Sequence, residues 1–331
     1  ILRGIRRYAH THQSWSIFLE QRDLSGEPPP WIKSWDGDGI ISRISTRSMV
    51  EDALRLKIPL IDLTDRHETF ALHQVWSDDG AIAELGAEHL LERGFQNFGF
   101  CGFAQEKWSD RRREGFVEAV GRKGWACQTY ESPWFGRDVH PWELEQQQIM
   151  AWLRALPKPA GIMACNDYRG QHVLDACSRL DLAVPEEIAV IGVDDEEELC
   201  ELCEPPLSSV VPNAEMVGYR AAELLDRLMS GGGELESHLE IAPIAVVTRQ
   251  STDVLAIDDP EIAAAVRYIR ENACRGAKVE DILDDVPISR SILERRFRKY
   301  LGHSPQALIR QTRLKRVKQL LVDTDLTLAK I

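Results

Sequence analysis

The sequence predicts an α/β body followed by a small all-α domain that contains a helix-turn-helix. Over residues 1 to about 250, short apolar β-rich runs alternate with helical patterns, which is typical of βαβ units and a mainly parallel sheet. Near the end, Val279 to Gly302 predicts a short helix, a tight turn at 286–288 and a second helix with Ser289 as its N-cap. A chain of 331 residues with 44% apolar content can bury the core of two or three domains.

Strand and helix patterns follow one another along the body. Six strands are predicted at 39–41, 58–63, 98–101, 161–164, 188–193 and 241–247. Helical patterns lie at 50–56, 80–93, 112–122, 145–156, 171–180 and 215–229. The first ten residues form an amphipathic helix pattern rather than a signal peptide, because no apolar h-region follows their charges. No run of about 18 apolar residues occurs, so the sequence predicts no membrane span.

Polar residues follow four of the predicted strands, where open α/β sheets bind ligands. They are Asp65-Arg66, Trp108 with Arg112, Asn166-Asp167 and Asp194-Asp195. Carboxylate, amide and guanidinium groups bind sugar hydroxyls in pairs, and an indole offers a flat apolar face to the sugar ring. Each residue taken singly also fits a bland role as a helix cap or a water ligand. Four such places at successive strand ends favour a sugar site.

Enzymatic and metal chemistry have little support in the sequence. No GxSxG, P-loop, GxGxxG or HExxH motif occurs, so we expect no enzyme and no cofactor. Seven cysteines, an odd number spread along a long chain, are typical of reduced thiols in a cytosol. Cys200 and Cys203 have redox or metal spacing, but no second such pair accompanies them.

The second helix of the helix-turn-helix has two distinct faces. One carries an apolar stripe of Leu293, Phe297, Tyr300 and Leu301. The opposite face, which we expect to meet DNA, carries Arg290, Ser291, Glu294, Arg295 and Arg298. A surface helix with merely solvated charges is the alternative interpretation of this pattern.

Segregated charge favours the DNA interpretation. The window 286–320 holds ten Lys or Arg against one acid, a net charge of +9, whereas the whole chain has a formal net charge of −13 and the remainder therefore −22. A basic segment on an acidic body is typical of a phosphate-binding module. We therefore expect double-stranded DNA to contact only the basic end.

Two known families resemble the two halves of the chain. Residues 1 to about 252 resemble the sugar-sensing domain of the LacI type, related to periplasmic ribose-binding proteins, through GDGII (37–41), IPLIDLTDR (58–66), AEHLLERGFQNFGFCG (87–102), SDRRREGFVEAV (109–120), GIMACNDYRG (161–170), VPEEIAVIGVDD (184–195) and PPLSSVVPNAEMVGYRAAELL (205–225). From about residue 259, ISRSILERRFRKYLGHSP and RLKRVKQLL resemble the AraC/XylS-type DNA-binding domain. Together, with TRQSTD (248–253) at the junction, they resemble the regulators of xylose operons.

The resemblance implies a fold, a function and a place in the cell. A two-lobed, periplasmic-binding-protein-like (type I), Rossmann-like sensor would span 1–252, a linker 253–258, and an all-α AraC-type helix-turn-helix domain 259–331. The chain would regulate, as an activator, genes of sugar catabolism by binding a monosaccharide such as xylose or a related pentose. It would bind its DNA operator as a homodimer, in the bacterial cytoplasm and associated with the nucleoid.

Residue by residue, the resemblance makes Arg112, Asn166 and Asp194 the central sugar contacts. Asp65-Arg66 match the ribose-binding pattern better than that of the xylose regulators. Pro212 stands where relatives commonly place a Gln that supports the sugar, which leaves the identity of the sugar open.

The resemblance also predicts how the chain begins, ends and moves. The chain starts at the helix after the first strand of the LacI-type fold and stops inside the second helix-turn-helix unit, so we expect a fragment in which a long helix runs from Pro305 to about Leu321. Lobe one would hold 1–103 and about 211–235, lobe two about 104–207 and 236–252, with three crossing strands as the hinge. Sugar would favour the closed form and so reorient paired DNA-binding domains.

Two other functions remain open on sequence grounds. A solute-binding protein of a sugar transporter would explain residues 1–250, but it needs no basic helix-turn-helix. An enzyme with a doubly wound fold would need a nucleophile or cofactor motif. Retention on DNA that depends on salt separates a regulator from both.

Overall fold

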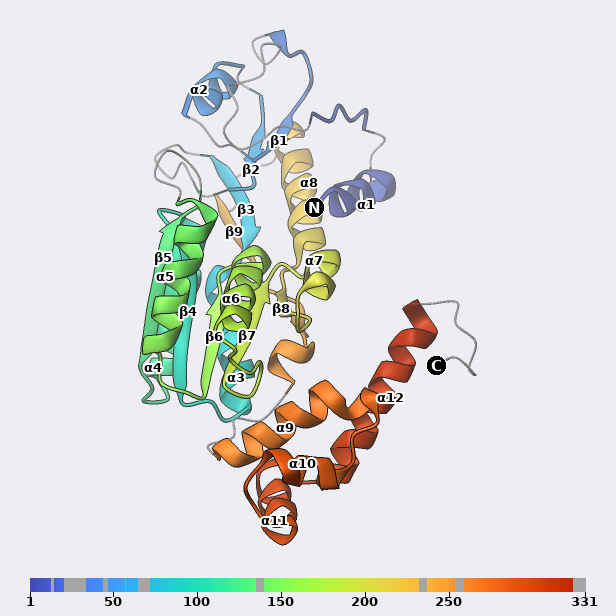
Figure 1. Ribbon diagram of the computed structural model, residues 1–331. Helices are drawn as coiled ribbons and strands as arrows, with labels where there is room; N and C mark the ends of the chain where they lie inside the picture. The colour runs from blue at the N-terminus through green and yellow to red at the C-terminus, as the bar shows by residue number, and fades with distance from the viewer. Residues whose placement is uncertain are drawn as a thin grey trace.

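The computed structural model describes residues 1–12, 15–20, 34–43, 47–56, 58–64, 72–134, 140–231, 237–253 and 259–323. These residues form two parallel-type sheets, each covered by helices, and a C-terminal group of helices (Figure 1). Among the residues described, no helix combines the length and the apolar character that crossing a membrane requires.

The first sheet builds a small lobe, called lobe one here. Its parallel strands lie in the order β1 (Ile40–Ser42), β2 (Leu60–Asp62), β3 (His73–Ser77) and β9 (His238–Ile241). Its helices are α1 (Leu2–His12), α2 (Arg47–Leu56) and α8 (Ala214–Met229), and α1 confirms the helix expected at the start of the chain.

Helices α1 and α8 approach each other closely through two glycines. A Cβ atom added to Gly4 would lie 1.8 Å from the carbonyl oxygen of Glu215, and one added to Gly218 would lie 2.0 Å from that of Ile1. Only glycine permits this backbone contact.

The second sheet builds lobe two, in the strand order β10-β8-β7-β6-β4-β5. Its strands are β4 (Asn97–Ala104), β5 (Cys127–Pro133), β6 (Ala160–Ala164), β7 (Ile188–Val193), β8 (Ser208–Val211) and β10 (Ala245–Val247), and only β10 is antiparallel to its neighbour. Its helices are α3 (Asp79–Glu92), α4 (Lys107–Gly121), α5 (Trp142–Ala155), α6 (Asp167–Arg179) and α7 (Glu197–Leu202).

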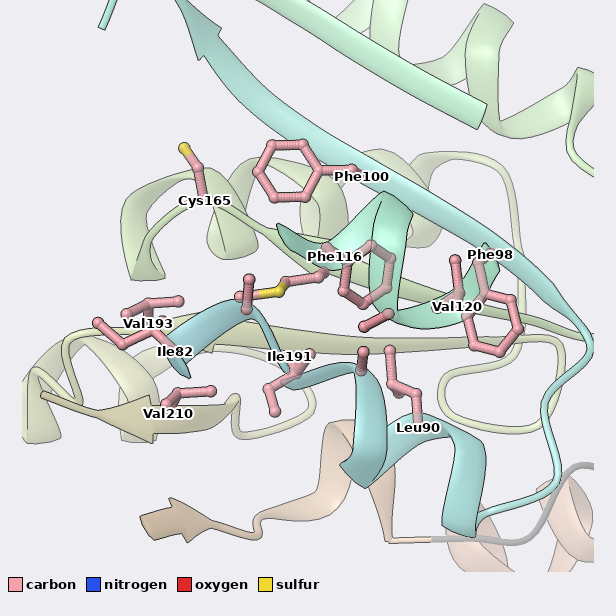
Figure 2. Packing of buried hydrophobic residues seen from close by; sticks show 14 of the residues in the cluster. Ile82, Leu90, Phe98, Phe100, Phe116, Val120, Cys165, Ile191, Val193 and Val210 are labelled. Carbon is pink, nitrogen blue, oxygen red and sulfur yellow. The ribbon is translucent and has the colours of Figure 1, made fainter. Parts of the chain in front are cut away.

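Helices cover both faces of this sheet. On one face, Phe116 of α4 and Leu90 of α3 pack with Phe98 and Phe100 of β4 (Figure 2). On the other face, α5 and α6 bury a second apolar cluster against β4, β6 and β7. The central parallel strands β4, β6 and β7 are buried on both sides, which explains their continuous apolar runs in the sequence.

Three connections join the lobes, as expected, but they lie elsewhere in the chain than predicted. The chain crosses between β3 and α3, between β8 and α8, and between β9 and β10. The predicted boundary at residue 103 is therefore wrong, because α3 packs in the core of lobe two. The single strand predicted at 241–247 is also wrong, since it comprises β9 in lobe one and β10 in lobe two.

The end of lobe two is held by buried hydroxyl groups. In the short 3₁₀ helix η2 (Gln250–Thr252), Thr252 donates to the Ser208 hydroxyl at 2.7 Å, and its hydroxyl lies 2.8 Å from Nε2 of His89. Burial lowers the pKa of His89 to about 3, so this imidazole is neutral at physiological pH.

The C-terminal helices pack around their own apolar core. They are α9 (Pro260–Asn272), the 3₁₀ turn η3 (Ala273–Arg275), α10 (Val279–Asp285), α11 (Arg290–Leu301) and α12 (Pro305–Asp323). Ile262, Ile282, Leu293, Phe297 and Ile309 are among the residues buried there. Arg270 of α9 links this group of helices to lobe two: it lies 3.0 Å from the carboxylate of buried Glu186.

Candidate functional site

Arg112 lies at the centre of the predicted ligand edge. It is 7% exposed, its Nε donates to Asp79 at 2.8 Å, and its Nη1 donates to the Cys165 carbonyl at 2.6 Å. The Asp194 carboxylate lies 3.9 Å from the same Nη1. Burial opposes the charge of Arg112, but the two carboxylates outweigh it and raise its pKa. The guanidinium therefore stays charged and fixed between two acids.

Asp194 and Asp195 form a strained turn after β7. Their φ angles are 111° and 52°, in the left-handed region that non-glycine residues seldom adopt. Asp195 uses its carboxylate to bind Arg249 at 2.8 Å, whereas the Asp194 side chain keeps 39% of its surface exposed. Strain of this kind is concentrated at functional sites. The turn leaves Asp194 available for a ligand.

Burial is the main cause that raises the pKa of Asp194 to about 6, and Arg112 opposes the shift. Arg43, which follows β1 in lobe one, also lowers this pKa through its charge. Charged residues of both lobes therefore influence the pKa of Asp194.

An aromatic corner borders these charges. The indoles of Trp108 and Trp134 lie 5.6 Å apart at an interplanar angle of 80°, and Phe103 stacks on Trp134 at 5.1 Å and 17°. Trp108 donates to Glu106 at 2.9 Å, and the Arg112 guanidinium lies 5.1 Å from the centroid of the Trp108 ring. Two indoles at right angles offer a flat face and a side wall to an apolar ring surface.

Asn166 lies at this edge and acts as a helix cap, which is the alternative role that the sequence allowed for it. Its side-chain oxygen accepts from the Arg169 amide at 3.0 Å as the N-cap of α6, and it is 5% exposed. Its neighbour Asp167 is 1% exposed and accepts from the Ser209 hydroxyl at 2.6 Å and from the Glu196 amide at 2.9 Å. Burial raises the pKa of Asp167 to about 7. Through its hydrogen bond with the Glu196 amide, Asp167 thus stabilises the strained turn.

Lobe one adds a buried polar cluster at the end of β2. Asp62 accepts from Thr64 at 3.0 Å and from the Gln74 side chain at 3.2 Å, and both Asp62 and Gln74 are fully buried. The predicted residues Asp65 and Arg66 lie outside the described residues.

Three residues of this edge were missed by sequence reasoning: Asp79, Phe103 and Trp134. Asp79 binds Arg111 at 2.8 Å as well as Arg112. It follows β3, whose mixed sequence HQVWS gives no strong strand pattern. Trp134 likewise follows the unpredicted strand β5. If these two strands had been predicted, the rule that ligands bind at the ends of strands would also have indicated Asp79 and Trp134.

The cysteine pair does not form a reactive site. Cys200 and Cys203 are buried free thiols in lobe two, and burial raises the pKa of both, that of Cys203 to about 11. Thiols with raised pKa are inert as nucleophiles. Across the residues described, no group of three or more His, Cys, Asp or Glu side chains is arranged to hold a metal ion.

The helix-turn-helix has the predicted layout. Leu293 and Phe297 are fully buried in the core of the helical domain, with Tyr300 and Leu301 packed beside them. On the opposite face Arg290, Ser291, Arg295 and Arg298 are exposed, and Glu294 is half-buried. Arg290 pairs with Glu280 at 2.7 Å and with Glu294 at 3.4 Å. The two faces of α11 are therefore distinct.

Some details of this domain differ from the expectation. Ser289 occupies the N-cap position of α11 but makes no side-chain capping bond; its hydroxyl lies 3.3 Å from that of Ser291. Two residues of the basic window have internal partners. Arg296 pairs with Asp259 and Glu261 of the α9 start, and Arg313 donates to the carbonyls of Ala273 and Ala277. The charge that faces outward is thus smaller than the sequence count.

Comparisons with known proteins agree with both halves of this architecture. Residues 87–252 match a periplasmic binding protein-like domain, and residues 283–331 match a helix-turn-helix domain. The xylose operon regulatory protein of Escherichia coli strain K12 is 33% identical over 341 residues, covering 100% of this chain and 86% of that protein. That of Haemophilus influenzae is 34% identical, with 87% of its length covered. This chain belongs to the family of the xylose operon regulators.

A solved structure supports the same assignment. That of the xylose-binding transcription activator XylR matches with a TM-score of 0.79 and 31% identity, over 97% of this chain and 83% of that one. The expected fold, a periplasmic-binding-protein-like sensor followed by an AraC-type helix-turn-helix domain, is confirmed. Like other members of the family, the chain is a sugar-sensing, DNA-binding transcription regulator and not an enzyme.

Proposed function

We propose that the chain activates genes of sugar catabolism when a pentose, xylose first among the candidates, binds between the two lobes. The sensor comprises residues 1–252, the linker 253–258 and the DNA-binding domain 259–331. The names of the relatives above, regulators of xylose operons and a xylose-binding activator, support the choice of sugar. Free thiols at all the described cysteines suit a place in the bacterial cytoplasm, at the nucleoid.

The observation that carries this proposal is the arrangement around Arg112. A charged donor held between Asp79 and Asp194, beside the indoles of Trp108 and Trp134, combines the two things that sugar recognition needs. The charges bind hydroxyl pairs, and the indoles cover the apolar face of the ring. No helix cap or solvated surface requires these five residues together.

Individual roles follow from the atoms that remain available. Asp194 accepts hydrogen bonds from sugar hydroxyls, and Arg112 donates to them from the part of its guanidinium that stays exposed. Asn166 uses its oxygen as a helix cap, so its side-chain amide group is the part that would donate to the sugar. We retain Asp65 and Arg66 as contacts from lobe one, because the cluster at Asp62 places polar groups at the end of the same strand.

The outer face of α11 reads the operator. Arg295 and Arg298 are exposed along it, with Ser291 and Glu294 on the same side. Arg295 binds guanine in the major groove, Glu294 accepts from cytosine, and Arg290 and Arg298 bind phosphates. On DNA, the ion pairs of Arg290 with Glu280 and Glu294 would break, or the second of them would orient Glu294 toward a base.

The regulator works as a homodimer whose sensor has two states. Sugar contacts residues of both lobes, so it binds the closed form more tightly and shifts the population toward it. Closure bends the three connections between the lobes and moves the attached DNA-binding domains. Two domains then read two half-sites of the operator.

Titration calorimetry of the protein against xylose, arabinose, ribose and glucose tests the proposal. We expect one pentose to bind and to change the tryptophan fluorescence, since Trp108 and Trp134 line the site. A chain that binds no sugar of this panel, yet is folded, contradicts it. A sugar-binding protein of a transporter would bind sugar without salt-dependent retention on DNA, which separates that alternative.

A further inference from the structure

Arg169 of α6 is the largest fully buried side chain of the described residues, and the sugar-binding proposal gives it no task. It is 1% exposed. Its Nη1 donates to Glu145 and its Nη2 donates to the Ser132 hydroxyl at 2.6 Å. Ser132 in turn donates to Glu145 at 2.6 Å, and Nδ1 of His140 lies 3.1 Å from the second oxygen of Glu145. A buried charge with such costly desolvation needs an explanation.

The guanidinium also lies against the aromatic corner. Its central carbon is 4.1 Å from the centroid of Phe103, the ring on which Trp134 stacks at 5.1 Å. The Phe103 ring therefore contacts both the buried guanidinium and the exposed indole. Arg169, Phe103 and Trp134 therefore form a stack that runs from the core of lobe two to the exposed indole.

The same guanidinium fixes the backbone that carries Trp134. Ser132 lies in β5, two residues before Trp134, which directly follows the strand. Arg169 thus holds Trp134 at two places, through the hydroxyl of Ser132 and through the ring of Phe103. Lysine could not do both, because its ammonium has neither the planar fork nor a face to stack.

We propose that Arg169 is a positioning residue for the sugar site: it sets the orientation of Trp134 and hence the right angle between the two indoles. It touches no sugar itself. The proposal rests on the proposed function for the effect on affinity, but not for the effect on the indole pair, which exists in the protein without sugar.

The test compares Arg169→Met with a matched control, Arg93→Met. Arg93 is also partly buried and donates to two carbonyls, but it lies at the far end of α3 from Asp79, about 20 Å along a helix of this length. Near-UV circular dichroism of the sugar-free protein reports the coupling between the two indoles. Calorimetry reports sugar affinity.

We expect Arg169→Met to change the indole signal and to weaken sugar binding about tenfold, the size of one lost aromatic contact. Arg93→Met should lower the melting temperature and leave the signal and the affinity unchanged. In a Trp134→Ala background, Arg169→Met should cause little further loss of affinity, because the positioned ring is gone.

Two results would overturn the proposal. One is an unchanged indole signal in folded Arg169→Met. The other is an equal loss of affinity with and without Trp134, which would show that Arg169 acts by another route. If Arg169→Met does not fold, Phe103→Leu breaks the same stack and must change the indole signal in the same way. If the parent protein binds no sugar, the proposed function fails, while the indole signal still decides the role of Arg169.

Discussion

Replacement of Arg112 by alanine removes a guanidinium that donates to Asp79 and to the Cys165 carbonyl and lies 3.9 Å from the Asp194 carboxylate. In the sugar-free protein the loss is limited, because Asp79 keeps Arg111 at 2.8 Å. The main cost is one charge-assisted hydrogen bond to a buried group, about 2 kcal/mol. For a domain of about 250 residues this lowers the melting temperature by about 4–8 °C.

Sugar binding should suffer more than folding. In the proposed site Arg112 and Asp194 face the same ligand, and without the guanidinium the Asp194 carboxylate loses the larger of the two positive charges that oppose its raised pKa. A hydrogen bond from a charged group to a sugar hydroxyl contributes about 1.5–3 kcal/mol. The expected loss of affinity is therefore about 10- to 100-fold at 1.4 kcal/mol per factor of ten.

Calorimetry and thermal unfolding of three variants measure these effects. Arg112→Lys keeps a charge but replaces the two separate donors Nε and Nη1 by a single nitrogen, so it should fall between alanine and arginine. Arg111→Ala is the control, since it removes the other, 30% exposed partner of Asp79 and should change sugar affinity by less than about threefold. Unchanged affinity in Arg112→Ala, or an equal loss in Arg111→Ala, would refute the assignment of the site.

Three further predictions concern pH, DNA and the helical core. Sugar affinity should fall below about pH 6 as Asp194 is protonated, and calorimetry from about pH 7 to about pH 4 checks this sign. In DNA-binding titrations, Arg295→Ala should cost about 1–3 kcal/mol of binding free energy on the preferred operator and relax the base preference at one base pair. Arg298→Ala should instead weaken binding to all DNA sequences and lower the salt slope by about one. The reverse pattern would mean that the groove-facing side of α11 is misassigned. Phe297→Ala, in a fully buried position, should cost about 3–5 kcal/mol and abolish DNA binding with sugar affinity intact, and loss of both activities would contradict separate cores.

The sequence predicts those parts of the fold that are strongly apolar or strongly periodic. β7 was predicted at its observed bounds because every residue from Ile188 to Val193 is buried. By contrast β3, β5 and β8 were missed, since HQVWS, CQTYESP and SSVV mix polar and apolar residues without a clear period. Their order in the two sheets depends on long-range packing that no local pattern encodes.

The site was predicted only as far as those strands allowed. Trp108, Arg112 and Asp194 lie together because each follows a strand that the pattern revealed, and the strand-end rule then applies. Asp79 and Trp134 were not predicted because the strands that precede them, β3 and β5, were not predicted. The predicted lobe boundary is wrong for a related reason: α3 follows a connection between the lobes, and its side is set by long-range contacts with lobe two, such as Gly86 against Met163 of β6 and Val210 of β8.

In the proposed regulator, a sugar held by Arg112 controls DNA binding by α11. This control is tested most directly by fluorescence anisotropy with DNA selected by the protein from a random pool, with and without xylose. Xylose should change the DNA affinity of the parent protein and have no effect on that of Arg112→Ala at the same concentration, while both proteins bind DNA with the same salt dependence. A DNA affinity that is indifferent to every pentose, or an Arg112→Ala variant that responds to xylose like the parent, would contradict this control.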